Sequence, residues 1–219
     1  MANLGSARND PPSSQIVLRP PEPKAVKVNP RRTLLQIVDM QTDFVGPENR
    51  KNMWQADDGI SSIRMLLEKA REAEMTVVFQ FSTAIRNPYE KTIKQLRLEH
   101  LKSDPSYGRI IEEFKPLLTP NEYIVPKTTH DIFFHTYMEE LLNKLPNIDT
   151  AIITGTVTNV CVLYTVAGYC VRGYKVIVPM DAVIAKNRED QAATLHVMAV
   201  HSAQFPATMT LSNMISFEK

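Results

Sequence analysis

The chain has 219 residues, enough for one α/β domain, and its 43% hydrophobic and 22% charged residues are typical of a globular protein. A formal net charge of +1, without a basic stripe, gives no support to a nucleic-acid partner. No apolar run approaches the roughly 20 residues that span a bilayer, and the N-terminus has no apolar signal segment. Two cysteines nine positions apart do not make a disulfide framework, so we expect a cytoplasmic protein with free thiols and no membrane partner.

Residues 1–31 differ in composition from the rest of the chain. They contain six of the fifteen prolines and little that could pack in a core. We therefore expect residues 1–31 to be a disordered or extended N-terminal arm, and residues 32–219 to form one folded domain.

Apolar runs and helical periodicity alternate along residues 32–219. The runs predict six strands, at 33–38, 75–81, 122–126, 150–154, 175–179 and 208–211. Helices are predicted from Asp58, over 89–101, over 134–145, over 159–172 with Gly173 as the terminating residue, and over 188–202. Residues 41–58 are expected to form a long loop. The alternation predicts a three-layer αβα protein with a doubly wound, mainly parallel, six-stranded sheet.

Three chemically active side chains follow predicted strands. Asp39, Lys127 and Cys161 each lie just beyond the C-terminal end of one of them. In doubly wound sheets, ligands bind outside the carboxyl ends of the strands. An acid, a base and a thiol are therefore expected to converge on one edge of the sheet.

Cys161 is expected in the first turn of a helix that begins directly after a strand. Gly155 ends the strand, and Thr158 and Asn159 offer N-cap side chains. Unpaired N–H groups and the positive end of the helix dipole lower the pKa of a thiol there, which favours a nucleophilic thiolate. The structural alternative is a buried core thiol, the fate expected of Cys170.

Three motifs together resemble the isochorismatase-like cysteine hydrolases: VDMQTDF at 38–44, Lys127 before the Phe133–Phe134 pair, and GTVTNVCV at 155–162. The resemblance covers residues 30–215, and the arm RPPEPKAVKVNPRRT points to the branch of N-carbamoylsarcosine amidase and ureidoacrylate amidohydrolase. The resemblance implies an isochorismatase-like hydrolase domain over 32–219. It also implies a catalytic triad of Asp39, Lys127 and Cys161 and a cis peptide at Thr156–Val157, next to the oxyanion hole.

These roles are chemically sensible. Asp39 can take the thiol proton and pass it to the leaving nitrogen, while Lys127 holds Asp39 ionised and favours the thiolate. The N–H groups of Val157 and Cys161 would face the developing oxyanion. The expected reaction is attack on a carbonyl carbon, loss of ammonia or an amine, and hydrolysis of the thioester. The ordinary alternatives are that Asp39 caps a turn and that Lys127 is a solvated surface residue.

Two departures within the superfamily narrow the expected reaction. Nicotinamidases bind a metal through an Asp-x-His…His set after the second strand, where this chain reads FSTAIRNPYEK, without His or Asp. We therefore expect no metal and no other cofactor. Isochorismatase itself cleaves a vinyl ether without needing a cysteine, so Cys161 favours cleavage of a C–N bond.

The residues that line the substrate pocket are the feature that the sequence predicts least well. Aromatic candidates for its wall, each with core packing as the alternative, are Phe44, Trp54, Phe133 and Tyr164. Candidates to meet a substrate carboxylate, each with plain solvation as the alternative, are Asn49, Arg50 and Arg86.

Three functions remain open from the sequence. The leading interpretation is a metal-independent amidohydrolase that acts on a small amide, carbamoyl or ureido compound. The others are a vinyl ether hydrolase of the isochorismatase type and a catalytically silent binding homologue. The segment 162–171 is apolar nearly all round, so we also expect a homo-oligomer, a dimer or tetramer, with a small-molecule substrate as the other partner.

Overall fold

A computed structural model describes residues 20–83, 108–200 and 207–218. Its centre is a seven-stranded sheet in the order β4-β3-β2-β5-β6-β8, with the short strand β7 paired to β5. The strands are β2 (Thr33–Val38), β3 (Thr76–Ser82), β4 (Glu122–Lys127), β5 (Thr150–Thr156), β6 (Lys175–Pro179), β7 (Val183–Ile184) and β8 (Thr208–Thr210). All pairings between these strands are parallel, so the predicted α/β fold class is confirmed, and β7 adds a strand to the six expected.

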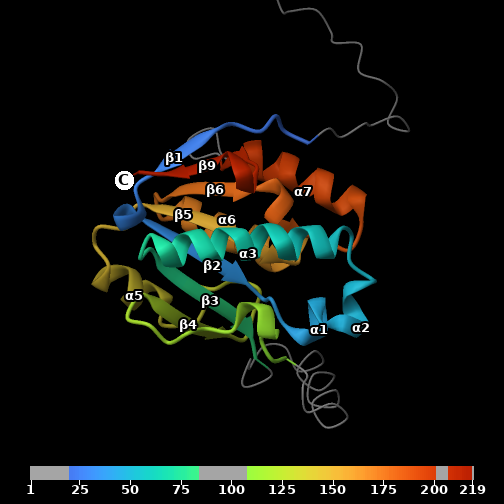
Figure 1. The fold of residues 1–219 in the computed structure, drawn as a ribbon, viewed down its shortest axis with the longest axis horizontal. Helices are drawn as coiled ribbons and strands as arrows, with labels where there is room; N and C mark the ends of the chain where they lie inside the picture. Colours follow the sequence, from blue (N-terminus) through green and yellow to red (C-terminus); the bar gives the residue numbers. More distant parts are fainter. Residues whose placement is uncertain (1–19, 84–107, 201–206, 219) are drawn as a thin grey trace, which may run out of the picture.

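Helices cover both faces of this sheet (Figure 1). One face carries α3 (Ala56–Glu72), and the other carries α5 (Met138–Lys144), α6 (Leu163–Val171) and α7 (Arg188–Val200). The alternation of β2 explains the two cores, because Leu35 and Ile37 pack on the α3 side whereas Leu34 and Val38 pack on the other. Burial on both faces is the reason why the strands of this sheet read as continuous apolar runs.

Two segments differ from the sequence prediction. The predicted loop 41–58 contains two short helices, α1 (Thr42–Val45) and α2 (Pro47–Arg50). The helix predicted over 134–145 begins only at Met138, because the preceding residues form side-chain-capped turns and His135 has a positive φ of 52°. Gly173, with φ of 81°, follows the end of α6 as predicted. The helix predicted over 89–101 lies outside the described residues.

A second, two-stranded sheet ties the start of the described chain to its end. Strand β1 (Val26–Val28) pairs in parallel with β9 (Ile215–Phe217). Its buried residues Val28 and Ile215 join the core on the α3 side. The part of the 1–31 arm that the structure describes therefore contains one strand and a short 3₁₀ turn, Pro30–Arg32.

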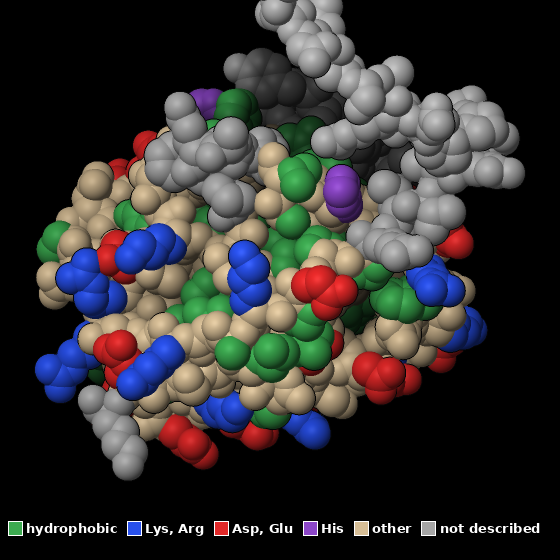
Figure 2. All heavy atoms as spheres, turned by 90° about the horizontal axis from the view of Figure 1, so that it is seen from above, with side chains coloured by type: hydrophobic (Ala, Val, Ile, Leu, Met, Phe, Trp, Pro, Cys, Tyr) green, Lys and Arg blue, Asp and Glu red, His purple; other side chains and the backbone are tan. Residues whose placement is uncertain are grey.

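On the face in Figure 2, acidic and basic side chains are intermingled, and apolar side chains gather near the centre. Among the described residues, no large patch of a single charge sign is visible on this face, and the formal net charge of the chain is +1. Within the described ranges, no helix is both long enough and apolar enough to cross a bilayer.

Candidate active site

The carboxyl ends of four adjacent strands form one edge of the sheet. Asp39 directly follows β2, Ser82 ends β3, Lys127 ends β4, and Cys161 follows β5 by one turn. The chain proceeds from β2 through β3 to β4 in one direction and from β5 through β6 to β8 in the other. The switch between these directions falls between β2 and β5, which is where ligands bind in open α/β sheets.

Lys127 is the centre of a buried polar cluster. Its Nζ donates to Asp39 Oδ2 at 2.8 Å, to Ser82 Oγ at 2.7 Å and to the Thr129 carbonyl at 3.1 Å. Ser82 Oγ donates in turn to Asp39 Oδ2 at 3.1 Å. The Lys127 and Asp39 side chains are both 0% exposed. Removing two charges from water is costly, so a buried ion pair of this kind is a better indicator of function than of stability.

The electrostatic partners of Lys127 keep it charged. Burial alone would lower the pKa of the ammonium, but the adjacent Asp39 and Cys161 outweigh it and raise the pKa above its ordinary value. Asp39 itself has a positive φ of 47°, a conformation that non-glycine residues rarely adopt and that clusters at functional sites. Its Oδ1 has no hydrogen-bond partner among the described residues, which leaves a carboxylate oxygen for a further proton donor.

Cys161 lies in a π-helical turn, Thr158–Val162, that leads into α6. The preceding peptide bond Thr156–Val157 is cis, and Thr156 Oγ1 donates to the Ile184 carbonyl at 3.2 Å. The sulphur is 3.4 Å from Lys127 Nζ and 3.5 Å from His130 Nδ1. The cysteine is 3% exposed, so the thiol lies within the polar cluster rather than on the surface.

The predicted lowering of the Cys161 pKa is wrong for the resting site. Burial raises the pKa of the thiol, the Asp39 carboxylate raises it further, and the Lys127 charge only partly compensates, so it lies at about 12. The predicted N-cap is also absent, since Val157 occupies the cap position and makes no side-chain cap. The resting thiol is therefore protonated at neutral pH, and a thiolate forms only if a neighbouring base removes the proton.

A buried hydrogen-bond chain fixes the turn that carries Cys161. Thr165 Oγ1 donates to the Cys161 carbonyl at 2.7 Å and can also reach Gln80 Oε1 at 3.2 Å. Gln36 Nε2 donates to the same Gln80 oxygen at 3.4 Å, and Tyr169 Oη donates to Gln36 Oε1 at 2.9 Å. This chain joins α6 to β2 and β3 and thereby sets the position of the sulphur relative to the sheet edge.

The aromatic pocket candidates lie in different places. Tyr164 is 53% exposed, and its ring lies 6.0 Å from that of His130. Phe133 is in the core, edge-on to Tyr169 at 5.1 Å and under the Arg172 guanidinium. The structure thus places Tyr164 beside His130, which contacts the thiol, and gives Phe133 a packing role.

The other two aromatic candidates are half-buried. Phe44, in α1, packs against the core on the α3 side. Trp54 lines a separate cavity of about 250 Å³ with Pro20, Met180 and Leu195, and the lining includes none of the three predicted catalytic residues.

The loop residues proposed to meet a substrate carboxylate are already bonded. Arg50 donates to Glu113 at 2.9 Å, to Asp57 at 3.2 Å and to the Val45 carbonyl at 3.1 Å. Asn49 donates to the Thr42 carbonyl at 3.0 Å. Arg86 lies outside the described residues.

The sequence reasoning missed Ser82 and His130. Ser82 of β3 is paired in register with Lys127 of β4. Its position, a polar residue at the carboxyl end of a strand, is the sequence feature that could have identified it. His130 follows Lys127 by three residues, and only the turn after β4 brings it to the sulphur. No group of three or more His, Cys, Asp or Glu able to hold a metal occurs in the described part of the chain.

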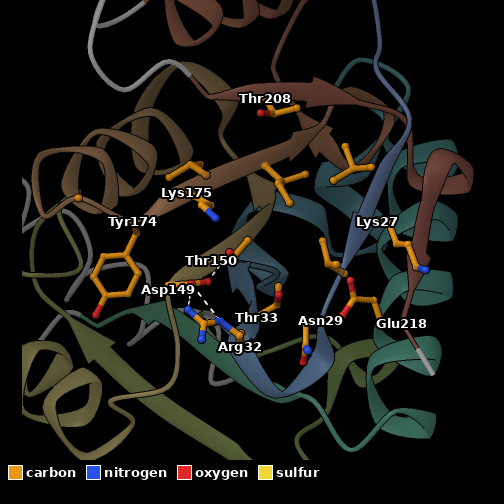
Figure 3. Close-up of a pocket in the computed structure, with 15 residues that line it drawn as sticks. Lys27, Asn29, Arg32, Thr33, Asp149, Thr150, Tyr174, Lys175, Thr208 and Glu218 are labelled. Carbon is orange, nitrogen blue, oxygen red and sulfur yellow. Dashed lines mark hydrogen bonds and ion pairs between the residues drawn. The ribbon is translucent and has the colours of Figure 1, made fainter.

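A larger cavity, about 620 Å³, opens at the opposite edge of the sheet (Figure 3). Its walls include the first residues of four strands, namely Thr33, Thr150, Lys175 and Thr208. Arg32 and Asp149, which also line it, are bonded to each other. None of Asp39, Lys127 and Cys161 lines this cavity, so it is separate from the cluster at the carboxyl edge.

The fold and the cluster define a class: a doubly wound α/β protein with a buried Cys–Lys–Asp arrangement at the switch point of its sheet. The sequence model described as "Isochorismatase domain" matches residues 33–212, and the chain belongs to this family. A ureidoacrylate amidohydrolase (RutB) of Pantoea ananatis is 26% identical over 164 residues, covering 64% of this chain and 64% of the relative.

Two solved structures have the same fold. A cysteine hydrolase from Pseudomonas syringae pv. phaseolicola has a TM-score of 0.70 and 26% identity, with 91% of this chain and 95% of that chain covered. The N-carbamoylsarcosine amidase of Thermoplasma acidophilum has a TM-score of 0.67 and 24% identity, with 83% of this chain and 97% of that chain covered. The protein is therefore an isochorismatase-family hydrolase.

Proposed function

We propose that the protein is a metal-independent cysteine hydrolase that cleaves a C–N bond of a small amide, carbamoyl or ureido compound. The observation that carries this proposal is the contact of Lys127 Nζ with both Asp39 Oδ2 and Cys161 Sγ, at 2.8 and 3.4 Å, in a buried site. The similarity to a ureidoacrylate amidohydrolase supports the choice of substrate class.

The reaction begins with transfer of the thiol proton to Asp39, whose Oδ1 has no other hydrogen-bond partner among the described residues. The sulphur then attacks the carbonyl carbon, and Lys127 stabilises the thiolate that forms. The N–H groups of Val157 and Cys161 are assigned to the oxyanion. Asp39 returns the proton to the leaving nitrogen, and water hydrolyses the thioester.

We infer that deprotonation of the thiol is coupled to substrate binding, because burial and Asp39 raise the pKa of the thiol in the empty site. A thiolate in the empty site would be exposed to alkylation and oxidation. With burial and Asp39 holding the thiol pKa at about 12, the nucleophile forms only when a carbonyl is in place to react with it.

The test is ammonia release from a panel of primary amides, N-carbamoyl amino acids and ureido acids after dialysis against EDTA. We expect the wild-type protein to release ammonia from at least one ureido or carbamoyl compound, and Cys161→Ser to release it from none. Release of ammonia that depends on added zinc, or that persists in Cys161→Ser, would contradict the proposal.

A homo-oligomer is part of the same proposal. Exposed apolar side chains lie on α6 and α7, which pack against each other: Tyr164, Val171, Val197 and Val200. A second copy covering this surface would remove it from water.

A further inference from the structure

His130 is the contact of the reactive sulphur that solvent can reach. The sulphur touches Lys127 Nζ and His130 Nδ1 at 3.4 and 3.5 Å. Lys127 is 1% exposed and Asp39 is 0% exposed, whereas His130 is only half-buried. His130 is therefore more exposed than Lys127, the other side chain in contact with the sulphur.

The backbone on both sides of His130 is fixed. The Thr129 carbonyl accepts from Lys127 Nζ at 3.1 Å, and Thr129 Oγ1 donates to the Asp131 carbonyl at 3.2 Å. Asp131 Oδ1 accepts from the Phe133 N–H at 2.9 Å. The turn thus holds the imidazole in a set place relative to the sulphur, as a group acting on a reacting atom requires.

We propose that His130 is the general base of the second half of the reaction, the hydrolysis of the thioester. This inference rests on the proposed function. Asp39 Oδ2 already accepts from Lys127 and Ser82, and the carboxylate is sealed from solvent, so it is placed to serve the thiol. The attacking water comes from the half-open side, where His130 stands.

The proton and electron balance is complete. The water oxygen bonds to the thioester carbonyl carbon, and its proton passes to Nδ1 of a neutral His130 that carries its own hydrogen on Nε2. The tetrahedral intermediate collapses, the C–S bond breaks, and its electron pair returns to the Cys161 sulphur. His130 then gives its proton to the sulphur, which restores the thiol and releases the carboxylic or carbamic acid.

The step predicts a pH dependence of its own. Deacylation requires neutral His130, so its rate should rise with pH as the imidazole loses its proton. Among the described residues, the ionisable side chains next to His130 include Cys161, whose sulphur is 3.5 Å from Nδ1, and Tyr164 of α6, whose ring centroid lies 6.0 Å from that of the imidazole. Lys127 contacts the same sulphur.

The experiment uses p-nitrophenyl acetate, which can acetylate a reactive thiol without resembling the natural substrate. The p-nitrophenolate burst gives the acylation rate, the steady state gives deacylation, and intact mass shows acetyl-Cys161. We expect the acylation rate of His130→Gln to be within about threefold of the wild-type rate, and its deacylation rate to be at least about 100-fold lower. His135→Gln, an exposed histidine of the same segment, is the matched control and should change neither rate.

Two further readouts separate catalysis from a structural effect. Deacylation by the ordinary chain should rise with pH as described, and imidazole added to His130→Ala should restore part of the lost rate. Two results would overturn the role of His130 but leave the proposed function intact. One is an equal deacylation rate in His130→Gln and the wild-type protein, and the other is a wild-type deacylation rate that does not rise with pH. If the ordinary chain forms no acetyl-Cys161, the thioester chemistry of the proposed function fails as well.

Discussion

At the residue scale, replacing Asp39 should have opposite effects on the alkylation rate of Cys161 and on turnover. The Asp39 carboxylate raises the pKa of the Cys161 thiol. Asp39→Asn should therefore speed alkylation of Cys161 by iodoacetamide at pH 8, and yet lower kcat/KM at least about 100-fold because the proton acceptor is gone. Peptide mapping of the alkylated protein measures the first effect. Slower alkylation together with normal turnover would remove Asp39 from the mechanism.

Lys127 should behave differently from Asp39. The Lys127 charge lowers the pKa of the thiol, so Lys127→Ala should slow both alkylation and turnover. We expect turnover to fall at least about 100-fold and the alkylation rate to fall several-fold. Lys144, at the end of α5, provides the control, and Lys144→Ala should leave both rates unchanged. A Lys127→Ala variant with the alkylation rate of the ordinary chain would contradict the contact between the two groups.

Ser82 orients the ion pair through two hydrogen bonds, to Lys127 Nζ and Asp39 Oδ2. Each bond involves a charged group, and losing one such bond costs about 1.5–3 kcal/mol. Ser82→Ala should lower kcat/KM by about 10- to 100-fold with little change in the circular dichroism spectrum. Ser82→Thr keeps the hydroxyl and should recover much of the loss, and failure of Thr to do better than Ala would count against this role.

The stability of the protein should fall at alkaline pH because of Cys161. In the unfolded chain the thiol loses its proton near pH 8.5, whereas in the folded chain its pKa is about 12. Between these values the folded state binds more protons, so the free energy of unfolding decreases as pH rises, by about 2 kcal/mol between pH 8 and pH 10. The raised pKa of Lys127 acts in the same direction at higher pH.

Urea unfolding at pH 8 and pH 10 measures this term. Cys161→Ser has no thiol at this position, so its stability should change less over the same interval, by about the 2 kcal/mol attributed to the thiol. Cys170 contributes equally to both proteins and cancels. The same pH slope in both proteins would show that the Cys161 pKa is not raised.

At the element scale, the close approach of β2 and β5 depends on Gly155. Its φ is 114°, and a Cβ at this position would lie 2.1 Å from the Val38 carbonyl oxygen. Gly155→Ala should therefore destabilise the protein by several kcal/mol and disturb the strand ends that carry Asp39 and Cys161. Gly173→Ala is the control, because its φ of 81° costs strain while nothing lies within 4 Å. Thermal unfolding should separate the two variants clearly, and equal melting temperatures would contradict the tight contact.

The sequence predicted most strands because their burial on both faces produces uninterrupted apolar runs, as in 33–38 and 150–154. It also located Asp39, Lys127 and Cys161, since strand ends are marked by the change from apolar to polar residues. It did not predict the thiol pKa, because helix position suggested a lower value while burial and Asp39 determine the actual one. It missed His130 because the contact depends on a turn whose shape is set by side-chain hydrogen bonds.

At the scale of the whole molecule, the exposed apolar side chains of α6 and α7 predict association. Val171 is 73% exposed and Val200 is 61% exposed, although both lie on helices that pack on the sheet. Light scattering at micromolar concentration should give a dimer or tetramer mass, and Val171→Glu should shift it toward the monomer. A monomer mass for the ordinary chain would refute the prediction.

The central claim is that Cys161 forms a covalent bond with the acyl part of a C–N substrate. Acid quenching during turnover of a ureido or carbamoyl compound, followed by peptide mass mapping, tests it directly. We expect an acyl adduct on the peptide that contains Cys161 and none on Cys170, with the adduct most abundant in His130→Gln. Product formation with Cys161 unmodified in every sample, or turnover by Cys161→Ser, would contradict covalent catalysis by Cys161.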